Sequence, residues 1–281
     1  ALRDDDPVTS TYREHGQALA RGSDPKAVMA ELFGRRDGLC GGRGGSMHLM
    51  DAKRHFYGGY GIVGGSIPLG VGLAWAIAYR QEDRVSLTMF GDGAVNQGVL
   101  AESMNMAQLW RLPVVFFCLN NQYGMGTALE RHSAEPDLFR RGEAYGMPAR
   151  QVDGMDVLAV HGAVTEAARL AREERQPSFI EAIAYRYRGH SMSDPDTVRA
   201  ADEKERWQAR DPLVTFERVL LGEGVLTGEE AREVVGRAEA TVEEAAAFAE
   251  ASPPVPESEL ARHVYANPWS DDPRGSARMP R

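Results

Sequence analysis

The chain of 281 residues contains only two cysteines, Cys40 and Cys118. Two cysteines cannot form the disulfide framework that supports small secreted folds. Cys118 falls in an apolar stretch, which predicts a buried, reduced thiol and a cytoplasmic protein. The sequence also lacks any apolar run near the roughly 18 residues that a membrane span requires. Its richest apolar run, residues 112–119, has the length of a strand, so no membrane partner is expected.

Positive charge is scarce as well. The chain has 32 Lys+Arg against 41 Asp+Glu, which gives a formal net charge of -9. A general nucleic-acid binder needs a basic surface, so no nucleic-acid partner is expected. The sequence has no G-x-x-x-x-G-K-[ST] motif, which excludes a P-loop nucleotide-binding protein. What remains is an ordinary globular composition, with 43% hydrophobic and 26% charged residues.

Apolar strands alternate with helices over the first two thirds of the chain. The pattern predicts strands at 84–90, 113–119, 148–153 and 177–187, and helices at 24–35, 66–80, 97–111 and 156–174. Continuous apolar strands of this kind are buried on both faces. We therefore predict an α/β fold, a mainly parallel sheet flanked by helices on both faces, with strands 84–90 and 113–119 adjacent.

The composition changes after Pro195. Residues 200–222 are charged and helical, and a capping box at 227–230 opens a long helix that ends near residue 251. An apolar stripe on this helix predicts packing; it consists of Ala231, Val234, Val235, Ala238 and Val242. We predict an α/β domain at 1–199 and, packed on it, a C-terminal helical extension at 200–281, frayed over 267–281.

A glycine-rich segment, residues 38–65, interrupts the pattern. It contains ten glycines: Gly38, Gly41, Gly42, Gly44, Gly45, Gly58, Gly59, Gly61, Gly64 and Gly65. Glycine serves flexible loops, but it also serves backbones that turn tightly or approach another group closely. Interleaved large side chains, among them Met47, His48 and Phe56, favour an ordered loop over a flexible surface loop.

Polar residues follow two of the predicted strands directly. Asp92 and Gly93 come after the strand at 84–90, and Asn120 and Asn121 follow the strand at 113–119. Ligands of open α/β sheets bind at the carboxyl ends of strands. Adjacent parallel strands would place Asp92 beside Asn121. The carboxylate and amide oxygens of these two residues are the hard ligands that magnesium prefers. A helix beginning near Ala94 would direct its amides at the phosphates of the same ligand. The alternative is two unrelated polar turns.

The spacing of these residues is that of a known signature, a GDG triplet and an NN pair separated by 26 residues. Further motifs occur in order: residues 12–16 (YREHG), 42–48 (GRGGSMH), 61–64 (GIVG), 120–127 (NNQYGMGT) and 187–195 (YRGHSMSDP). Together, over about residues 4–267, they resemble the alpha subunit of the thiamine-diphosphate-dependent decarboxylating dehydrogenase component of 2-oxo acid dehydrogenase complexes. The pyruvate and acetoin types are nearly indistinguishable by these motifs.

The resemblance implies a site. Asp92 and Asn121 would ligate Mg²⁺ through their side chains, and Tyr123 through its backbone carbonyl. The cofactor-binding residues implied for thiamine diphosphate are Tyr12, Arg13, Gly61, Val63, Gly93, Ala94 and Arg186. The implied catalytic residues are His190 and His15, because a histidine can transfer protons near neutral pH. His48 is left unassigned, and the remaining histidines are interpreted as core or surface residues: His55, His132, His161 and His263.

The resemblance also implies the reaction and the partners. The reaction is oxidative decarboxylation of pyruvate with acyl transfer to a lipoyl group on an acyltransferase component. A beta subunit would supply the activating Glu, in an assembly of two alpha and two beta subunits. Acetoin or another small 2-oxo acid is the rival substrate. A non-catalytic, truncated assembly subunit is the rival role, although Arg13, Asp92, Asn121 and His190 are all intact.

The resemblance carries two further expectations, one about the N-terminus of the chain and one about a loop beside the site. The family's N-terminal helical segment precedes the position of Tyr12, so the chain is expected to be a fragment or a shortened relative. Residues 188–200, here named the His190 loop, would form a mobile loop over the site. Ser191 in that loop matches a position that some relatives phosphorylate, where a phosphate would add nearly two negative charges.

Overall fold

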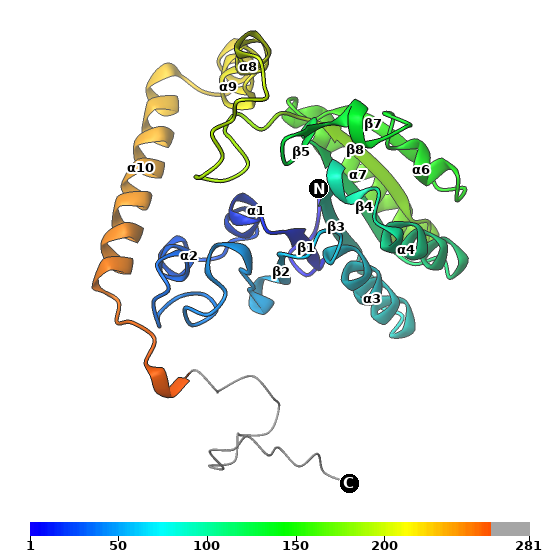
Figure 1. Ribbon diagram of the computed structural model, residues 1–281, viewed down its shortest axis with the longest axis horizontal. Coiled ribbons are helices and arrows are strands. Elements are labelled where there is room, and N and C mark those ends of the chain that lie inside the picture. The colour runs from blue at the N-terminus through cyan, green and yellow to red at the C-terminus, as the bar shows by residue number, and fades with distance from the viewer. Residues whose placement is uncertain (260–281) are drawn as a thin grey trace.

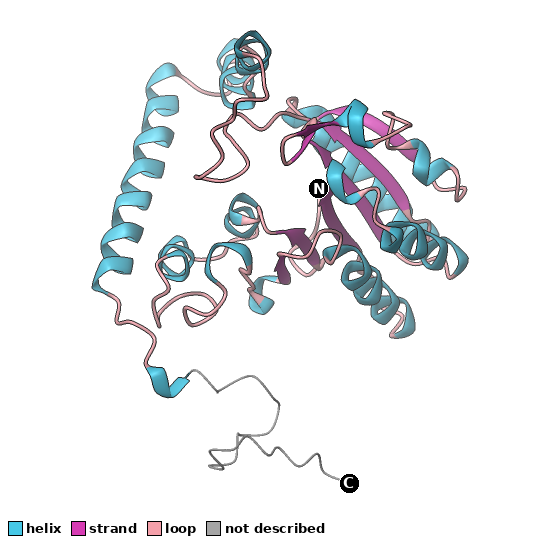
Figure 2. Ribbon diagram, viewed as in Figure 1, coloured by secondary structure: helices cyan, strands magenta, loops and turns pink. Residues whose placement is uncertain are grey.

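The computed structural model describes residues 1–259, and its centre is a six-stranded sheet in which every strand is parallel to its neighbours (Figures 1 and 2). The strand order is β2-β1-β3-β4-β8-β7. The bounds are β1 Val8–Thr11, β2 Phe56–Tyr60, β3 Ser86–Gly91, β4 Val114–Asn120, β7 Ala149–Asp153 and β8 Ser178–Ile183. The predicted fold class is confirmed.

Helices cover both faces of the sheet. Helices α3 (Ser66–Tyr79) and α4 (Gly98–Leu109) pack on the face to which Phe116 and Cys118 of β4 point. Helix α7 (Val157–Glu174) packs on the opposite face, against Val115 and Phe117. Successive residues of a strand point to opposite faces. Because both faces of β4 are covered, its sequence is apolar throughout instead of alternating.

The pairing of β3 with β4 positions the site. The two strands run in register from Ser86 opposite Val114 to Gly91 opposite Leu119. The predicted adjacency of these strands is therefore confirmed. Their carboxyl ends lie at one edge of the sheet, so the residues that follow them, Asp92 and Asn121, emerge side by side.

Strands β1 and β2 were not predicted from the sequence. Strand β2 lies inside the glycine-rich segment, and its Phe56 is fully buried. Gly59 permits a close approach, since a Cβ there would lie 2.2 Å from Cδ of Glu14. The ordered interpretation of this segment is thus correct, because it contributes a strand to the core. The strand predicted at 177–187 was too long, since β8 ends at Ile183.

Three helices follow the His190 loop: α8 (Ala201–Gln208), α9 (Pro212–Gly222) and α10 (Gly228–Ala251). The predicted capping box of α10 is present, because Thr227 and Glu230 exchange hydrogen bonds. Helix α10 packs on α2 (Pro25–Leu32), where Lys26 pairs with Glu244 at 3.2 Å. Figure 1 shows α10 extending from α9 to the level of α2. The C-terminal part of the predicted extension, including 267–281, lies outside the described residues.

The apolar stripe of α10 is only partly buried within this chain. Ala231 is buried, but Val234, Val235 and Val242 are about half exposed. The contacts of α10 are made instead by Ala245 and Ala249 near its C-terminal end.

Short elements complete the described chain: α1 His15–Ala20, α5 Leu129–His132, α6 Arg140–Glu143, β5 Tyr123–Gly124, β6 Thr127–Ala128, and 3₁₀ turns η1 Gly45–Met47, η2 Ala52–Arg54, η3 Asp92–Ala94 and η4 Glu257–Glu259. Within residues 1–259, none of the helices has the length and apolar character needed to cross a membrane.

Candidate functional site

A cavity of about 460 Å³ opens at the carboxyl ends of β1, β3 and β4. Its volume lies in the usual range of small-molecule sites, roughly 300–1,000 Å³. Most of the residues that the sequence nominated line it: Tyr12, Arg13, Val63, Asp92, Gly93, Ala94, Asn121, Tyr123, Arg186 and His190. Segments far apart in the chain therefore converge on one site.

Asp92 is the buried carboxylate of this cavity. It begins η3 immediately after β3 and is 1% exposed. One carboxylate oxygen, Oδ1, accepts a hydrogen bond from the backbone amide of Asn121 at 3.3 Å. The other, Oδ2, lies 3.2 Å from Nε2 of His132. Burial raises the pKa of Asp92, and these two contacts oppose the shift. A desolvated carboxylate at this position suits a cation.

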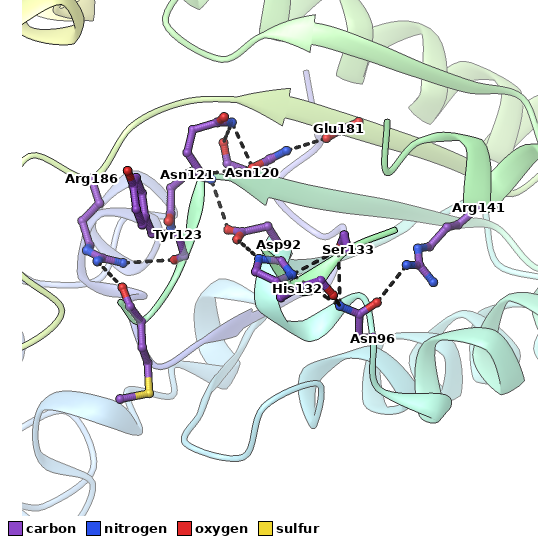
Figure 3. Close-up of polar contacts among 12 residues, drawn as sticks. Asp92, Asn96, Asn120, Asn121, Tyr123, His132, Ser133, Arg141, Glu181 and Arg186 are labelled. Atoms are coloured by element: carbon purple, nitrogen blue, oxygen red, sulfur yellow. Dashed lines mark hydrogen bonds and ion pairs between the residues drawn. The ribbon is translucent and has the colours of Figure 1, made fainter. Parts of the chain in front are cut away.

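The oxygen donors around Asp92 fit a hard metal ion. The side-chain oxygen Oδ1 of Asn121 is buried and has no hydrogen-bond partner. An orphaned buried acceptor is costly unless a further group satisfies it. The backbone carbonyl of Tyr123 accepts a hydrogen bond from Nη1 of Arg186 at 3.3 Å. Figure 3 shows Asp92, Asn121 and Tyr123 on neighbouring segments of the strand ends. Carboxylate, amide and carbonyl oxygens are the donor set that magnesium takes.

The backbone around Gly93 is closely packed. A Cβ at Gly93 would lie 3.3 Å from the Cα of Gly124, so a side chain there would crowd the β5 segment. The helical start expected near Ala94 is the short turn η3, and α4 itself begins only at Gly98. The amides at Gly93 and Ala94 therefore belong to a tight turn that lines the cavity.

Arg13 and Tyr12 surround His190 on the other side of the cavity. Nη2 of Arg13 donates to the backbone carbonyl of His190 and lies 3.0 Å from the ring nitrogen Nδ1. The Tyr12 hydroxyl lies 3.4 Å from Nε2 of the same ring. Burial and the charges of Arg13 and Arg186 lower the pKa of His190. The neutral imidazole is thus favoured, which leaves the ring able to accept a proton.

Arg186 links the metal-side loop to the His190 loop. Its guanidinium donates to the carbonyls of Tyr123, Met125 and Arg188, the last two at 2.7 and 3.1 Å. Burial and nearby Arg13 lower its pKa. The Tyr123 hydroxyl donates to the Glu203 carboxylate at 2.9 Å, and desolvation with this carboxylate raises the pKa of Tyr123 to about 12.

Gly61 and His15 do not line the cavity. His15 Nε2 donates to the carbonyl of Ser46 at 2.8 Å, in the glycine-rich segment. A Cβ at Gly61 would approach Cε1 of His48 at 3.3 Å. Val63, by contrast, lines the cavity and is 47% exposed, so its apolar side chain is available to a ligand.

The sequence missed His132. From the sequence it was interpreted as a core or surface histidine. In the structure it lines the cavity and contacts Asp92. It lies on α5, forty residues after Asp92, and no spacing rule links the two positions. Only the folding of α5 back against η3 brings them together.

The fold and the site together define a class. A parallel α/β sheet carries a buried carboxylate, further oxygen atoms and arginines at the carboxyl ends of its strands, which is where α/β enzymes bind their ligands. Comparison with known families is more specific. Residues 1–258 match the dehydrogenase E1 component family, and the chain belongs to it.

Named relatives agree with this assignment. The pyruvate dehydrogenase E1 component subunit alpha of Rhizobium meliloti is 47% identical over 261 residues, which cover 92% of this chain and 75% of that protein. The subunit of the same name from Rickettsia felis is 44% identical over 260 residues, covering 92% and 80%. The testis-specific mitochondrial form of Homo sapiens is 44% identical over 273 residues, covering 96% and 69%.

Proposed function

We propose that this chain is the alpha subunit of a thiamine-diphosphate-dependent pyruvate dehydrogenase, catalysing oxidative decarboxylation of pyruvate with acyl transfer to a lipoyl group. Family membership and the names of the relatives support this function. The single observation that carries it is the position of the Asp92 carboxylate beside Asn121 at adjacent strand ends, where the Asn121 amide donates to Asp92 and the Asn121 side-chain oxygen is buried without a partner.

In this proposal Asp92 and Asn121 hold Mg²⁺ by their side chains and Tyr123 holds it by its carbonyl. Arg186 now donates to that carbonyl, and its charge also suits a diphosphate. The remaining cofactor contacts are assigned to Tyr12, Arg13, Gly61, Val63, Gly93 and Ala94. When bound, thiamine diphosphate supplies the electron sink that decarboxylation requires. The amides of Gly93 and Ala94 offer donors to phosphate oxygens, and Val63 offers an apolar support.

His190 is assigned the proton-transfer role. Its lowered pKa and its hydrogen bonds with Tyr12 and Arg13 support a neutral, oriented imidazole. Arg13 orients the ring and offers its charge to the diphosphate. His15 is proposed as the second catalytic histidine, and its hydrogen bond to the Ser46 carbonyl ties it to the glycine-rich segment beside the cavity.

The partner in this proposal is a beta subunit that supplies the activating Glu, in an assembly of two alpha and two beta subunits. Exposed apolar side chains support a partner surface: Ile62 beside the cavity is 78% exposed, and Trp75 and Tyr79 stack on the outer side of α3 at 50% and 77% exposure. Large exposed apolar groups mark interaction sites. A lipoyl-bearing acyltransferase component completes the complex, and the cytoplasmic setting stays a prediction.

The test is reconstitution with a matching beta subunit. We expect pyruvate decarboxylation only when both subunits, Mg²⁺ and thiamine diphosphate are present. Asp92→Ala is expected to abolish cofactor binding in calorimetry. Unchanged cofactor affinity in that variant would contradict the metal assignment, and decarboxylation by the isolated chain would contradict the partner assignment. Acetoin turnover in place of pyruvate turnover would reassign the substrate.

Two variants separate the roles within the site. His190→Ala should leave cofactor affinity nearly intact and lower turnover about a hundred- to ten-thousand-fold, as loss of a positioned acid-base group does. Arg13→Ala should weaken cofactor affinity first. Activity titrated against thiamine diphosphate distinguishes them. Rescue of His190→Ala, but not of Arg13→Ala, by excess cofactor would reverse the two assignments.

A further inference from the structure

His132 ends a chain of side-chain contacts that leads to Asp92. Nη2 of Arg141 donates to Oδ1 of Asn96 at 2.8 Å. Nδ2 of Asn96 donates to the His132 carbonyl at 2.6 Å and reaches Oγ of Ser133 at 3.3 Å. Ser133 Oγ lies 3.1 Å from His132 Nδ1. Figure 3 shows this series running from Arg141 to Asp92.

The donors in this series fix the tautomer of His132. Asn96 presents its amide nitrogen, which only donates, and the Ser133 hydroxyl can donate to Nδ1. Nδ1 is therefore the acceptor, and the proton lies on Nε2. Nε2 is 3.2 Å from Oδ2 of Asp92, so the ring donates to that oxygen. A nitrogen that carries this proton has no lone pair for a cation, which makes His132 a neighbour of a metal ligand instead of a ligand.

Asp92 needs such a donor. Its carboxylate is 1% exposed, so little of it is open to bulk water. Its other contact, the Asn121 amide at 3.3 Å, is long for a charge-assisted hydrogen bond. His132 is held from two sides, by Asn96 and Ser133, and its side chain is 15% exposed. The rigid partner thus determines the rotation of the carboxylate.

We propose that His132 is a positioning residue for the metal site: its Nε2–H holds Oδ2 of Asp92, so that the carboxylate meets the cation in one orientation. This role rests on the proposed function, because it assumes that Asp92 is a metal ligand. Hydrogen bonds to ligating carboxylates set ligand orientation, and their loss typically costs about 10- to 100-fold in metal affinity.

The experiment measures Mg²⁺ affinity by calorimetry at fixed thiamine diphosphate, on the chain assembled with its beta subunit. His132→Ala should weaken Mg²⁺ binding about 10- to 100-fold. His132→Gln, which keeps an N–H donor at similar reach, should recover most of that loss. At saturating Mg²⁺ and cofactor, kcat of both variants should approach that of the parent. The matched control is His161→Ala, an exposed histidine on α7, which should change nothing.

Several outcomes overturn the proposal. Unchanged Mg²⁺ affinity in His132→Ala, with only a lower melting temperature of the cofactor-free protein, would make His132 a packing residue. Tighter Mg²⁺ binding would make it a competitor for Asp92. Loss in His132→Ala without recovery in His132→Gln would exclude the hydrogen bond as the cause. The Asp92→Ala variant separates the role of His132 from the proposed function. If Asp92→Ala still binds Mg²⁺ and cofactor normally, Asp92 is not a metal ligand and the proposed function itself is contradicted.

Discussion

Two segments border the cavity, and they are held in place by different chemistry. The glycine-rich segment contributes Tyr60 and Val63, and the His190 loop contributes His190. The first is tied down by a carboxylate from the core. Glu31 of α2 is fully buried and accepts hydrogen bonds from four backbone amides of that segment, those of Cys40, Gly42, Gly44 and Gly45, at 2.6 to 3.0 Å.

The His190 loop is held by groups within itself and on α8, and by Arg13 and Arg186, which donate to the carbonyls of His190 and Arg188. Asp194 accepts from the amides of His190 and Asp196 at 2.6 and 2.9 Å, and Asp196 in turn pairs with Arg199 at 2.6 Å and with Lys204. Residues 188–200 include neither helix nor strand, and Met192 is 98% exposed. The difference teaches that the two borders have separate stabilities. The first is part of the core, whereas we expect the second to open without unfolding the core.

The largest effect is expected at Glu31. Glu31→Ala would leave four backbone amides without their acceptor, at about 1–3 kcal/mol for each that stays buried. We expect a loss of about 3–6 kcal/mol in the free energy of unfolding, measured by denaturant titration. Glu31→Gln should lose less, since its amide oxygen still accepts. The matched control is Glu243→Ala, an exposed glutamate on α10. If Glu31→Ala and Glu243→Ala lower the free energy of unfolding equally, Glu31 does not tie the glycine-rich segment to the core, and the two borders do not differ in stability.

A second effect is expected at Gly59 in β2. A methyl group there would lie 2.2 Å from Cδ of the buried Glu14, so either the strand or the carboxylate must move. Overpacking of this kind costs about 1–3 kcal/mol. Gly162→Ala on α7 is the control, because its Cβ meets nothing within 4 Å. It should stabilise the protein by roughly 1 kcal/mol through helix propensity. A tolerated alanine at Gly59 would show that the glycine-rich segment is less fixed than its contacts indicate.

A smaller effect on global stability is expected at Arg199. This side chain pairs with Asp196 and lies over the rings of Tyr123 and Tyr185, at 5.7 and 5.2 Å from their centres. Arg199→Ala should change the free energy of unfolding by only about 1 kcal/mol, because the loop opens separately. Cleavage of residues 188–200 by thermolysin should nevertheless increase about tenfold. Arg188→Ala, which removes an exposed arginine of the same loop, is the control. Unchanged cleavage after Arg199→Ala would contradict a role of Arg199 in holding the His190 loop.

The smallest effect is a difference in pH dependence. Hydrogen bonds from amides lower the pKa of Asp194, and Arg199 lowers that of Asp196. Their contribution is present above the unfolded pKa of about 3.9 and is lost progressively as the pH falls from there toward the lowered folded pKa values. Burial raises the pKa of Glu14 beside β2, so its contribution is present at low pH and is lost as the pH rises through its folded pKa. Hydrogen-exchange protection from pH 7 to 3 should therefore fall first in residues 188–199. Simultaneous loss in residues 44–49 would contradict the comparison.

The residue patterns alone predicted four strands of the central sheet, β3, β4, β7 and β8, and the position of Asp92 beside Asn121. A strand that is covered on both faces has a continuous apolar sequence. The apolar run of β4 therefore indicated a parallel sheet covered by helices on both faces. The pairing of β3 with β4 then placed Asp92 beside Asn121 by a rule that needs only strand order. The two motifs that carry Arg13 (12–16) and His190 (187–195) both place these residues at the cavity. Each of these features depends on local patterns of residues.

Tertiary structure alone decided the features that join distant residues without a pattern. Strands β1 and β2 are too short, and β2 too rich in glycine, to carry a periodic signal. Glu31 and Glu14 look like ordinary charged positions until the fold buries them against backbone amides. His132 contacts Asp92 only because α5 returns to η3. The physical reason is that hydrogen bonds between distant segments depend on loop paths, and these paths are fixed by packing instead of by residue type at a given spacing.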